Sequence, residues 1–406
     1  MRKTELLIPA SCLEVLKAAV TFGADAVYIG GEVFSLRAKA INFSAEDMKE
    51  GIKFAHERGV KVYVTVNILA HNGDLENARA YIKELREIGP DAMIVSDPGI
   101  FDIIQEVWPE GEIHISTQAN NVNYGTYKFW QRQGAKRVVS GRELSLKEIK
   151  EIRQNIPDDL EIETFIHGAM CISYSGRCLL SNYFTGRDAN RGACTHPCRW
   201  KYAVMEEDRP GQYLPIEENE RGTFIFNSKD LCMIEHIPEL MDAGIDSFKI
   251  EGRMKTALYV ATVARTYRKA IDDFNESPEK YKENLPWYWD QIHQCTYRQY
   301  STGFFFGKPS DEGQIYDEST YEQGAIYLGI CEEGSGERAI ITQKNKFSVG
   351  DEIIIMKPDG RDIKTKVLEI VGEDGMKKDS CPHPKEKLSI LLDSSVEKYD
   401  ILKRLN

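Results

Sequence analysis

The sequence lacks long apolar runs and any excess of positive charge. It holds no stretch of about 20 apolar residues that could cross a bilayer. Glu14 and Lys17 interrupt the short apolar run near the N-terminus, which lacks the pattern of a secretory signal. We therefore expect a cytoplasmic protein with no membrane partner. The formal net charge of −12 is not typical of a nucleic-acid-binding protein. Phosphates, however, bind to a local basic surface, which the total charge does not describe.

Three common cofactor and catalytic motifs are also absent. No Gly-x-Gly-x-x-Gly follows the first predicted strand, which removes the best signal for a dinucleotide-binding sheet. Neither His-Glu-x-x-His nor Gly-x-Ser-x-Gly occurs, so the sequence offers neither a zinc-peptidase helix nor a hydrolase nucleophile elbow.

Short apolar strands alternate with amphipathic helical patterns through the first 170 residues. The predicted strands are Glu5–Pro9, Ala26–Gly30, Lys61–Asn67, Ala92–Asp97, Glu112–Gln118, Arg137–Gly141 and Glu161–Gly168, with Asp246–Arg253 as an eighth. Helices between strands imply parallel pairing with right-handed crossovers. A doubly wound sheet and a closed barrel both fit this pattern, and the count of eight favours a (β/α)8 TIM-like barrel, here assigned to residues 1–275.

Polar residues gather where the predicted strands end. In a barrel these ends meet at the functional mouth. The candidate substrate-binding residues are Asn67, Gln118, Arg142, Lys249, Glu251 and Arg253. Capping and turn formation explain some of them equally well. Three cations at one mouth, however, would suit an anionic substrate that bears carboxylates or phosphates.

Four of the nine cysteines fall within 28 residues, at Cys171, Cys178, Cys194 and Cys198. They lie in residues 169–245, an insertion after the seventh strand that far exceeds an ordinary loop. In a reducing compartment such a set is more typical of metal or redox chemistry than of disulfides. Only one pair has the spacing of a zinc knuckle, so a [4Fe-4S] cluster is favoured over zinc. Cys232 is a fifth candidate ligand, and scattered buried thiols are the plainer alternative.

His167 stands four residues before Cys171. A histidine beside a cysteine could activate a nucleophile. Peptide hydrolysis, however, does not need several further cysteines, and no third orienting group is evident. We instead predict that His167 transfers a proton, or donates a hydrogen bond behind a metal cluster.

The chain changes character after residue 275. Residues 276–315 are expected to form a linker followed by an aromatic segment, and residues 316–406 alternate as short strands typical of a small antiparallel β barrel. The tail carries a basic set that could hold RNA phosphates or simply be solvated: Lys344, Lys346, Lys357, Arg361, Lys364 and Lys366.

Four sequence runs resemble the signature of the bacterial collagenase-like peptidase family. They are ETFIHGAMCISYSGRC from Glu163 to Cys178, RGACTHPCRW from Arg191 to Trp200, FNSKDLC from Phe226 to Cys232, and KIEGRMK from Lys249 to Lys255. The likeness extends over nearly the whole chain, including the tail. The barrel with its C-terminal β domain is most similar to the branch of prephenate-dependent tRNA uridine 5-hydroxylases.

This resemblance implies a tRNA-modifying enzyme that hydroxylates carbon 5 of the wobble uridine. Other relatives hydroxylate a base of ribosomal RNA or a ubiquinone precursor. The family pattern implies an iron–sulfur cluster on Cys171, Cys178 and Cys194, with Cys198 or Cys232 as fourth ligand, and prephenate as the hydroxyl donor. Prephenate is a dicarboxylate, so Arg142, Lys249 and Arg253 would bind its two carboxylates. The alternatives are a collagenase-like peptidase and a noncatalytic, zinc-containing tRNA-binding protein.

Overall fold

Eight parallel strands close into a barrel in the computed structural model, which describes residues 4–36, 42–171, 173–174, 176–199, 218–219, 222–223, 228–307 and 322–406. The strands are β1 (Glu5–Pro9), β2 (Ala26–Gly30), β3 (Lys61–Val66), β4 (Ala92–Val95), β5 (Ile113–Ile115), β6 (Arg137–Val139), β7 (Glu161–Gly168) and β11 (Ser247–Ile250). They pair in that order, and β11 closes the ring between β7 and β1. The predicted TIM-like barrel is confirmed.

Buried residues on both faces of the strands explain their near-continuous apolar sequence. Strand β2, for example, is buried at all five positions, as expected where helices cover the outside and side chains fill the inside. Leu7, Tyr28, Tyr63 and Ile94 are part of one cluster of buried residues. The strand ends that face this interior carry the polar groups described below.

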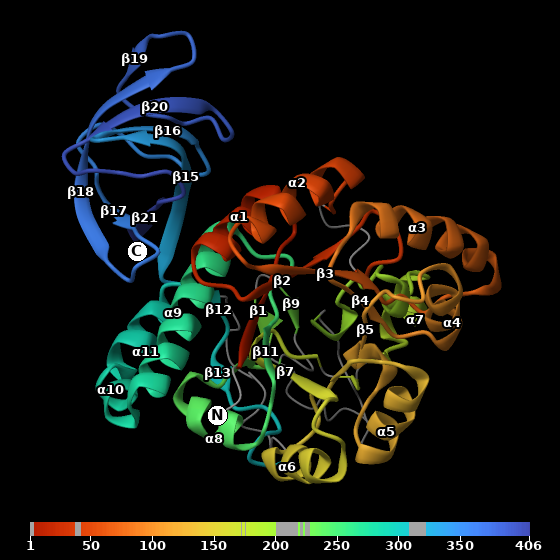
Figure 1. Cartoon of the computed structure of the whole chain (residues 1–406). Helices are drawn as coiled ribbons and strands as arrows, with labels where there is room; N and C mark the ends of the chain where they lie inside the picture. Colours follow the sequence, from red (N-terminus) through yellow and green to blue (C-terminus); the bar gives the residue numbers. More distant parts are fainter. Residues whose placement is uncertain are drawn as a thin grey trace, which may run out of the picture. The chain divides into compact units, whose positions relative to one another are not determined.

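Helices lie around the outside of the barrel strands in Figure 1. They include α2 (Ala45–His56), α3 (Leu75–Ile88), α4 (Pro98–Val107), α5 (Tyr124–Gln133) and α6 (Leu146–Asn155). Ser44, Asp97, Asn123 and Ser145 begin four of them, and each side chain accepts a hydrogen bond from a backbone N–H of the first turn. Local sequence thus fixes where each helix starts and where the preceding loop ends.

Two further strands extend the sheet beyond β7. Strand β10 (Asp230–Cys232) runs antiparallel to β7, and β13 (Tyr300–Ser301) runs parallel to β10. Arg298 and Asp230 anchor this extension through a buried ion pair of 2.7 Å. The remaining elements of this part are α7 (Leu180–Thr185), α8 (Ile237–Asp242), β8 (Glu218–Asn219) and β9 (Gly222–Thr223).

The chain divides into two compact units. One comprises Met1–Leu13, Asp25–Met254 and Arg298–Tyr321 and holds all eight barrel strands. The other comprises Glu14–Ala24, Lys255–Tyr297 and Glu322–Asn406. It contains most of α1 (Leu13–Thr21), together with α9 (Ala257–Glu276), α10 (Pro278–Glu283), α11 (Leu285–His293) and the C-terminal strands.

The C-terminal strands form a closed antiparallel barrel, as predicted. Its order is β17 (Glu352–Met356), β21 (Ile401–Leu405), β15 (Ala325–Ser335), β16 (Arg338–Thr342), β20 (Lys387–Leu392) and β18 (Asp362–Gly372), which pairs back with β17. Short strands β12 (Thr296–Tyr297), β14 (Glu322–Gln323) and β19 (Lys377–Lys378) add to this unit. Arg265 of α9 joins the helices to the β domain, because it donates to the Lys357 carbonyl at 2.9 Å and pairs with Asp362 at 2.8 Å.

The start of the segment expected to be a linker is helical. Ser277 caps α10 by accepting from the Lys280 N–H, Pro278 takes the first helical turn, and Lys280 pairs with Glu276. The polar composition of this segment therefore did not reveal the short helices α10 and α11. The end of the predicted segment, residues 308–321, lies outside the described ranges. No helix among the described residues has the length and apolarity needed to cross a membrane.

Candidate functional site

One cavity opens at the C-terminal ends of the barrel strands. Its interior volume is about 210 Å³. Its lining includes every predicted substrate-binding residue, namely Asn67, Gln118, Arg142, Lys249, Glu251 and Arg253. The four cysteines of the insertion, Cys171, Cys178, Cys194 and Cys198, line it as well. The fold thus brings two separate sequence predictions to one place.

The guanidinium of Arg142 stacks on the aromatic ring of Phe165. The guanidinium carbon is 4.1 Å from the centre of the Phe165 ring, and Nη1 donates to the Ala169 carbonyl at 2.9 Å. Glu251 is 3.6 Å from Nη2, a loose ion pair. Stacking and one backbone contact therefore hold the plane of this cation at the edge of the cavity.

Lys249 is the most buried cation of the cavity wall. Its Nζ lies 2.6 Å from Glu163, which has no exposed surface, and 4.4 Å from the centre of the Tyr28 ring. Burial alone would raise the pKa of Glu163, but the neighbouring charges of Lys249 and Arg137 hold it below its usual range. The floor of the cavity is thus a fixed ion pair.

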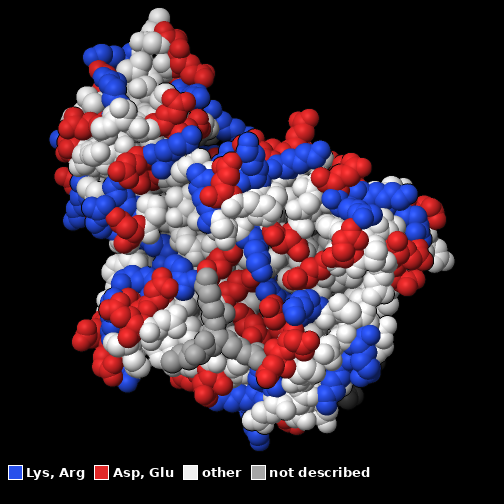
Figure 2. All heavy atoms as spheres, viewed as in Figure 1, with Lys and Arg blue, Asp and Glu red and all other residues white. Residues whose placement is uncertain are grey.

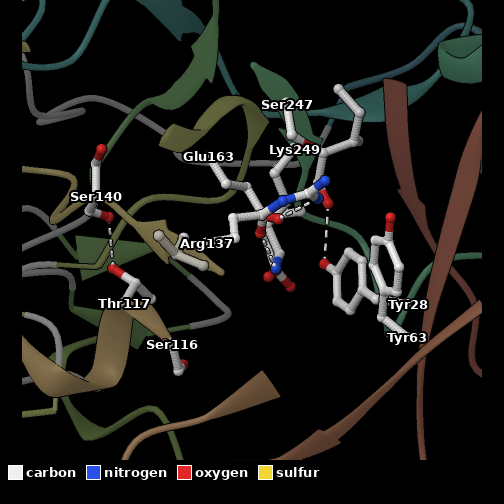
Figure 3. A network of polar contacts seen from close by, with 12 residues as sticks. Tyr28, Tyr63, Ser116, Thr117, Arg137, Ser140, Glu163, Ser247 and Lys249 are labelled. Atoms are coloured by element: carbon white, nitrogen blue, oxygen red, sulfur yellow. Dashed lines mark hydrogen bonds and ion pairs between the residues drawn. The ribbon is translucent and has the colours of Figure 1, made fainter. Parts of the chain in front are cut away.

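This ion pair is one end of a polar network along the barrel interior (Figure 3). Arg137, at the start of β6, contacts Glu5 at 2.6 Å, Glu161 at 2.6 Å and Glu163 at 3.1 Å. Tyr63 donates to Glu5 at 2.6 Å. The network therefore links the N-terminal ends of the strands to the cavity floor at Lys249.

Arg253 anchors the loop after β11 to the loop after β2. Its Nη1 donates to Ser35 Oγ at 2.7 Å and to the Leu36 carbonyl at 3.0 Å, and also to Thr65 Oγ1 of β3 at 3.3 Å. Asn67 is held by a 3.1 Å bond from its Nδ2 to Ser116 Oγ, and that same oxygen accepts from the Gln118 N–H. Several of the predicted substrate-binding groups are thus positioned by neighbours that also line the mouth.

The cysteine segment is fastened to the barrel rim. Arg191 forms two bonds to the Asp74 carboxylate, at 2.7 and 3.0 Å, and donates to the Leu69 carbonyl. The Leu69 N–H in turn donates to the Asn190 carbonyl. The hydrogen bonds from Arg191 hold the pKa of Asp74 down at about 2. This double contact fixes the chain directly before Cys194.

Gly176 lets the same segment approach the barrel closely. Its φ is +71°, and a Cβ there would stand 2.4 Å from the Gln118 carbonyl oxygen. Gly168, where β7 ends, has φ +109°, and a Cβ there would stand 2.2 Å from the Glu251 carbonyl oxygen. Both glycines are needed because a side chain would meet backbone.

We expect Gly176→Ala to displace the segment that carries Cys171 and Cys178. The matched control is Gly186→Ala, since Gly186 has a similar φ of +65° but open space around its Cβ position. Left-handed strain of about 1–2 kcal/mol is common to both variants. The clash is present only at position 176. Thermal unfolding and the rate of thiol labelling should therefore change more in Gly176→Ala, and equal changes would contradict the close approach.

His167 and Cys232 lie together but outside the residues that line the cavity. They are cross-strand partners of β7 and β10, and both are buried. The His167 ring is 5.6 Å from that of Tyr300. This position favours the supporting role for His167 over direct contact with a substrate.

The cysteines that line the cavity are of the residue type that binds a metal group, although their side chains are not gathered around one point in this structure. Thiolates are the ligands of structural zinc and of iron–sulfur clusters alike. Cys194 Sγ is 4.0 Å from His196 Nδ1. Across the described ranges, no three His, Cys, Asp or Glu side chains are gathered closely enough to hold a metal ion.

Several residues of the site were not predicted from the sequence. Tyr28, Phe165 and Tyr174 line the cavity, and Glu163 holds Lys249. A signal for Glu163 did exist, because a carboxylate in the middle of an otherwise apolar buried strand must have a partner.

The basic set of the tail is only partly available for RNA. Lys357 is buried and pairs with Asp400 at 2.7 Å, Lys344 pairs with Glu14, and Arg361 pairs with Asp359. Lys346, Lys364 and Lys366 are exposed. On the face drawn in Figure 2, acidic and basic side chains are interspersed. Whether the exposed lysines bind RNA stays a prediction.

Comparison with known proteins adds a family and named relatives. Peptidase family U32 matches residues 11–315, and the C-terminal domain of that family matches residues 323–403. The chain is 40% identical to tRNA hydroxylation protein P1 of Bacillus subtilis (strain 168), over 99% of this chain and 95% of that protein. It is 41% identical to tRNA hydroxylation protein P of Escherichia coli (strain K12), over 89% and 87%. The 23S rRNA 5-hydroxycytidine C2501 synthase of the same strain is 40% identical, over 66% and 39%.

Proposed function

The chain belongs to peptidase family U32, and we propose that within this family it hydroxylates tRNA, at carbon 5 of the wobble uridine. The observation that carries the proposal is the single cavity in which four cysteines and three cations meet at the mouth of the barrel. Two relatives that match most of the chain are named for tRNA hydroxylation, and another for making a hydroxylated base in ribosomal RNA.

The cavity suits a base removed from its stack. The cavity has an interior volume of about 210 Å³ and is open at its mouth, so a base can enter it from outside the barrel. RNA-binding proteins read unstacked bases of single-stranded loops, and enzymes that modify bases bind them outside the helix. Tyr174, which is 58% exposed, provides an aromatic ring in the lining.

We assign Cys171, Cys178, Cys194 and Cys198 as the ligands of an iron–sulfur cluster of the [4Fe-4S] type. Replacement of a ring C–H by C–OH is a two-electron oxidation of the base, balanced when the hydroxyl donor is reduced by two electrons as it gives up its OH group. The four cysteines would hold the cluster, which would supply redox chemistry beside the base. Cys198 is preferred over Cys232 as the fourth ligand because Cys198 lines the cavity with the other three.

Prephenate is our candidate for the hydroxyl donor. Arg142 is suited to one of its two carboxylates, because a guanidinium binds a carboxylate through two parallel hydrogen bonds. Arg253, whose Nη1 and Nη2 already donate to Ser35, Leu36 and Asn42, contributes positive charge beside it. The loose 3.6 Å pairing of Arg142 with Glu251 can give way to such a bond. Lys249 is paired with the Glu163 carboxylate at 2.6 Å, so it lines the cavity as a fixed N–H donor rather than as a net charge.

Peptide hydrolysis is not favoured by the site. Of the pair that could form a Cys–His nucleophile, Cys171 lines the cavity and His167 does not. The family name therefore carries no peptidase activity over to this chain.

The test is nucleoside analysis of tRNA from a strain that lacks this protein and any paralogue. We expect 5-hydroxyuridine derivatives to disappear and to return when the wild-type gene, but not a Cys171→Ala gene, is supplied. An unchanged nucleoside profile in the deletion strain contradicts the proposal.

A further inference from the structure

The cysteine-rich segment is locally basic in an acidic chain. Residues 169–199 contain four arginines, Arg177, Arg187, Arg191 and Arg199, and one acidic residue, Asp188, whereas the whole chain has a net charge of −12. Arg191 is occupied by Asp74. Arg177 and Arg187 are exposed. The segment beside the cavity therefore has a charge that attracts phosphates.

The same segment exposes large apolar side chains. Tyr183 is 81% exposed, Leu179 70%, Tyr174 58% and Phe184 45%. The Tyr183 and Phe184 rings meet edge to face, with centres 5.1 Å apart. Together these four side chains form an exposed apolar surface interrupted by arginines.

This surface adjoins the cavity and is held in place. Tyr174 is both exposed and part of the cavity lining. Helix α7, which carries Tyr183 and Phe184, packs against the short turns Ala189–Arg191 and Pro197–Arg199. Ser181 of α7 accepts from the Thr195 N–H at 3.0 Å. The rings thus stand on the segment that also bears Cys194 and Cys198.

We propose that Tyr174, Leu179, Tyr183 and Phe184, with Arg177 and Arg187, form a stacking surface for the single-stranded nucleotides that flank the target base. The inference rests on the proposed function, since it concerns the RNA that enters this cavity. Exposed aromatic rings stack unpaired bases, and arginines among them pair with the phosphates between those bases. The excess of arginine over acidic residues favours RNA over a protein partner.

The test uses the full-length protein and an anticodon stem-loop with 2-aminopurine beside the wobble position. Tyr183→Ala should weaken binding by about tenfold and reduce the fluorescence quenching that stacking causes, whereas Tyr183→Phe should retain both. Phe184→Ala should also weaken binding. Its control is Phe129→Ala, because Phe129 on the barrel helix α5 is equally 45% exposed and should be neutral.

The outcomes separate this inference from the proposed function. If the wild-type protein neither binds nor modifies tRNA, the proposed function fails. If the wild-type protein modifies tRNA, and Tyr183→Ala has the same KM and the same quenching as the wild type, the stacking role is disproved. The exposed surface would then be assigned to a protein partner. Iron content should equal that of the wild type in every variant, which excludes an indirect effect through the cysteines.

Discussion

Replacing Cys198 with alanine is expected to remove the bound iron and abolish tRNA hydroxylation, whereas Cys232→Ala should retain both. Cys198 lines the cavity beside Cys171, Cys178 and Cys194. Cys232 is 5% exposed, lies on β10 opposite His167, and is not part of that lining. A group bound by four thiolates is lost or made labile when one ligand is removed.

Anaerobic purification followed by iron, sulfide and zinc analysis measures this difference directly. We expect iron and sulfide in the wild type and in Cys232→Ala, and near-background iron in Cys198→Ala. Full iron in Cys198→Ala with loss in Cys232→Ala would reassign the fourth ligand. A colourless protein that contains zinc in place of iron and sulfide would exclude the cluster itself.

The largest effect on stability is expected from Arg137→Met. The side chain of Arg137 is 4% exposed and contacts Glu5, Glu161 and Glu163. Its removal leaves buried carboxylates without their cation, which typically costs about 3–5 kcal/mol. The control is Arg86→Met, because the Arg86–Glu110 pair is more than half exposed and should contribute less than about 1 kcal/mol. Urea unfolding of the two variants and the wild type gives both free energies, and similar losses would contradict the account.

The same network predicts how stability depends on pH. Burial alone would raise the pKa of Glu5, but Arg137 and the hydrogen bonds from Tyr63 and Ser247 lower it from 4.5 to about 2. A carboxyl with a depressed pKa stabilises the native state fully above its unfolded value, and this contribution is lost as the pH falls towards the folded value. The free energy of unfolding of the wild type should therefore decrease from about pH 5 towards pH 2. Arg137→Met should lose the part of this dependence that comes from Glu5 and Glu163.

Much of the barrel could be predicted because its signals are local. The bounds of β1, β2 and β7 agree with those predicted from apolar runs and turn residues. The side chains that follow the strands had to meet, since parallel strands end at one mouth. The cysteine cluster was visible because its four residues are close in sequence.

The partners of the charged residues could not be predicted in the same way. Lys249 and Glu163 are 86 positions apart and meet only because β11 closes the barrel against β7. In the tail, Lys357 looked like part of a basic surface but pairs with Asp400, 43 positions away. Long-range strand pairing, rather than composition, decides which charges are neutralised.

The most direct test of the account is transfer of labelled oxygen from prephenate to tRNA. Anaerobically purified protein would be incubated with unmodified tRNA and prephenate that carries heavy oxygen in its hydroxyl group, and the digested nucleosides analysed by mass spectrometry. The account predicts 5-hydroxyuridine that contains the label, and none with Cys171→Ala. Unmodified uridine at the wobble position, with the wild-type protein loaded with iron and sulfide, would contradict it.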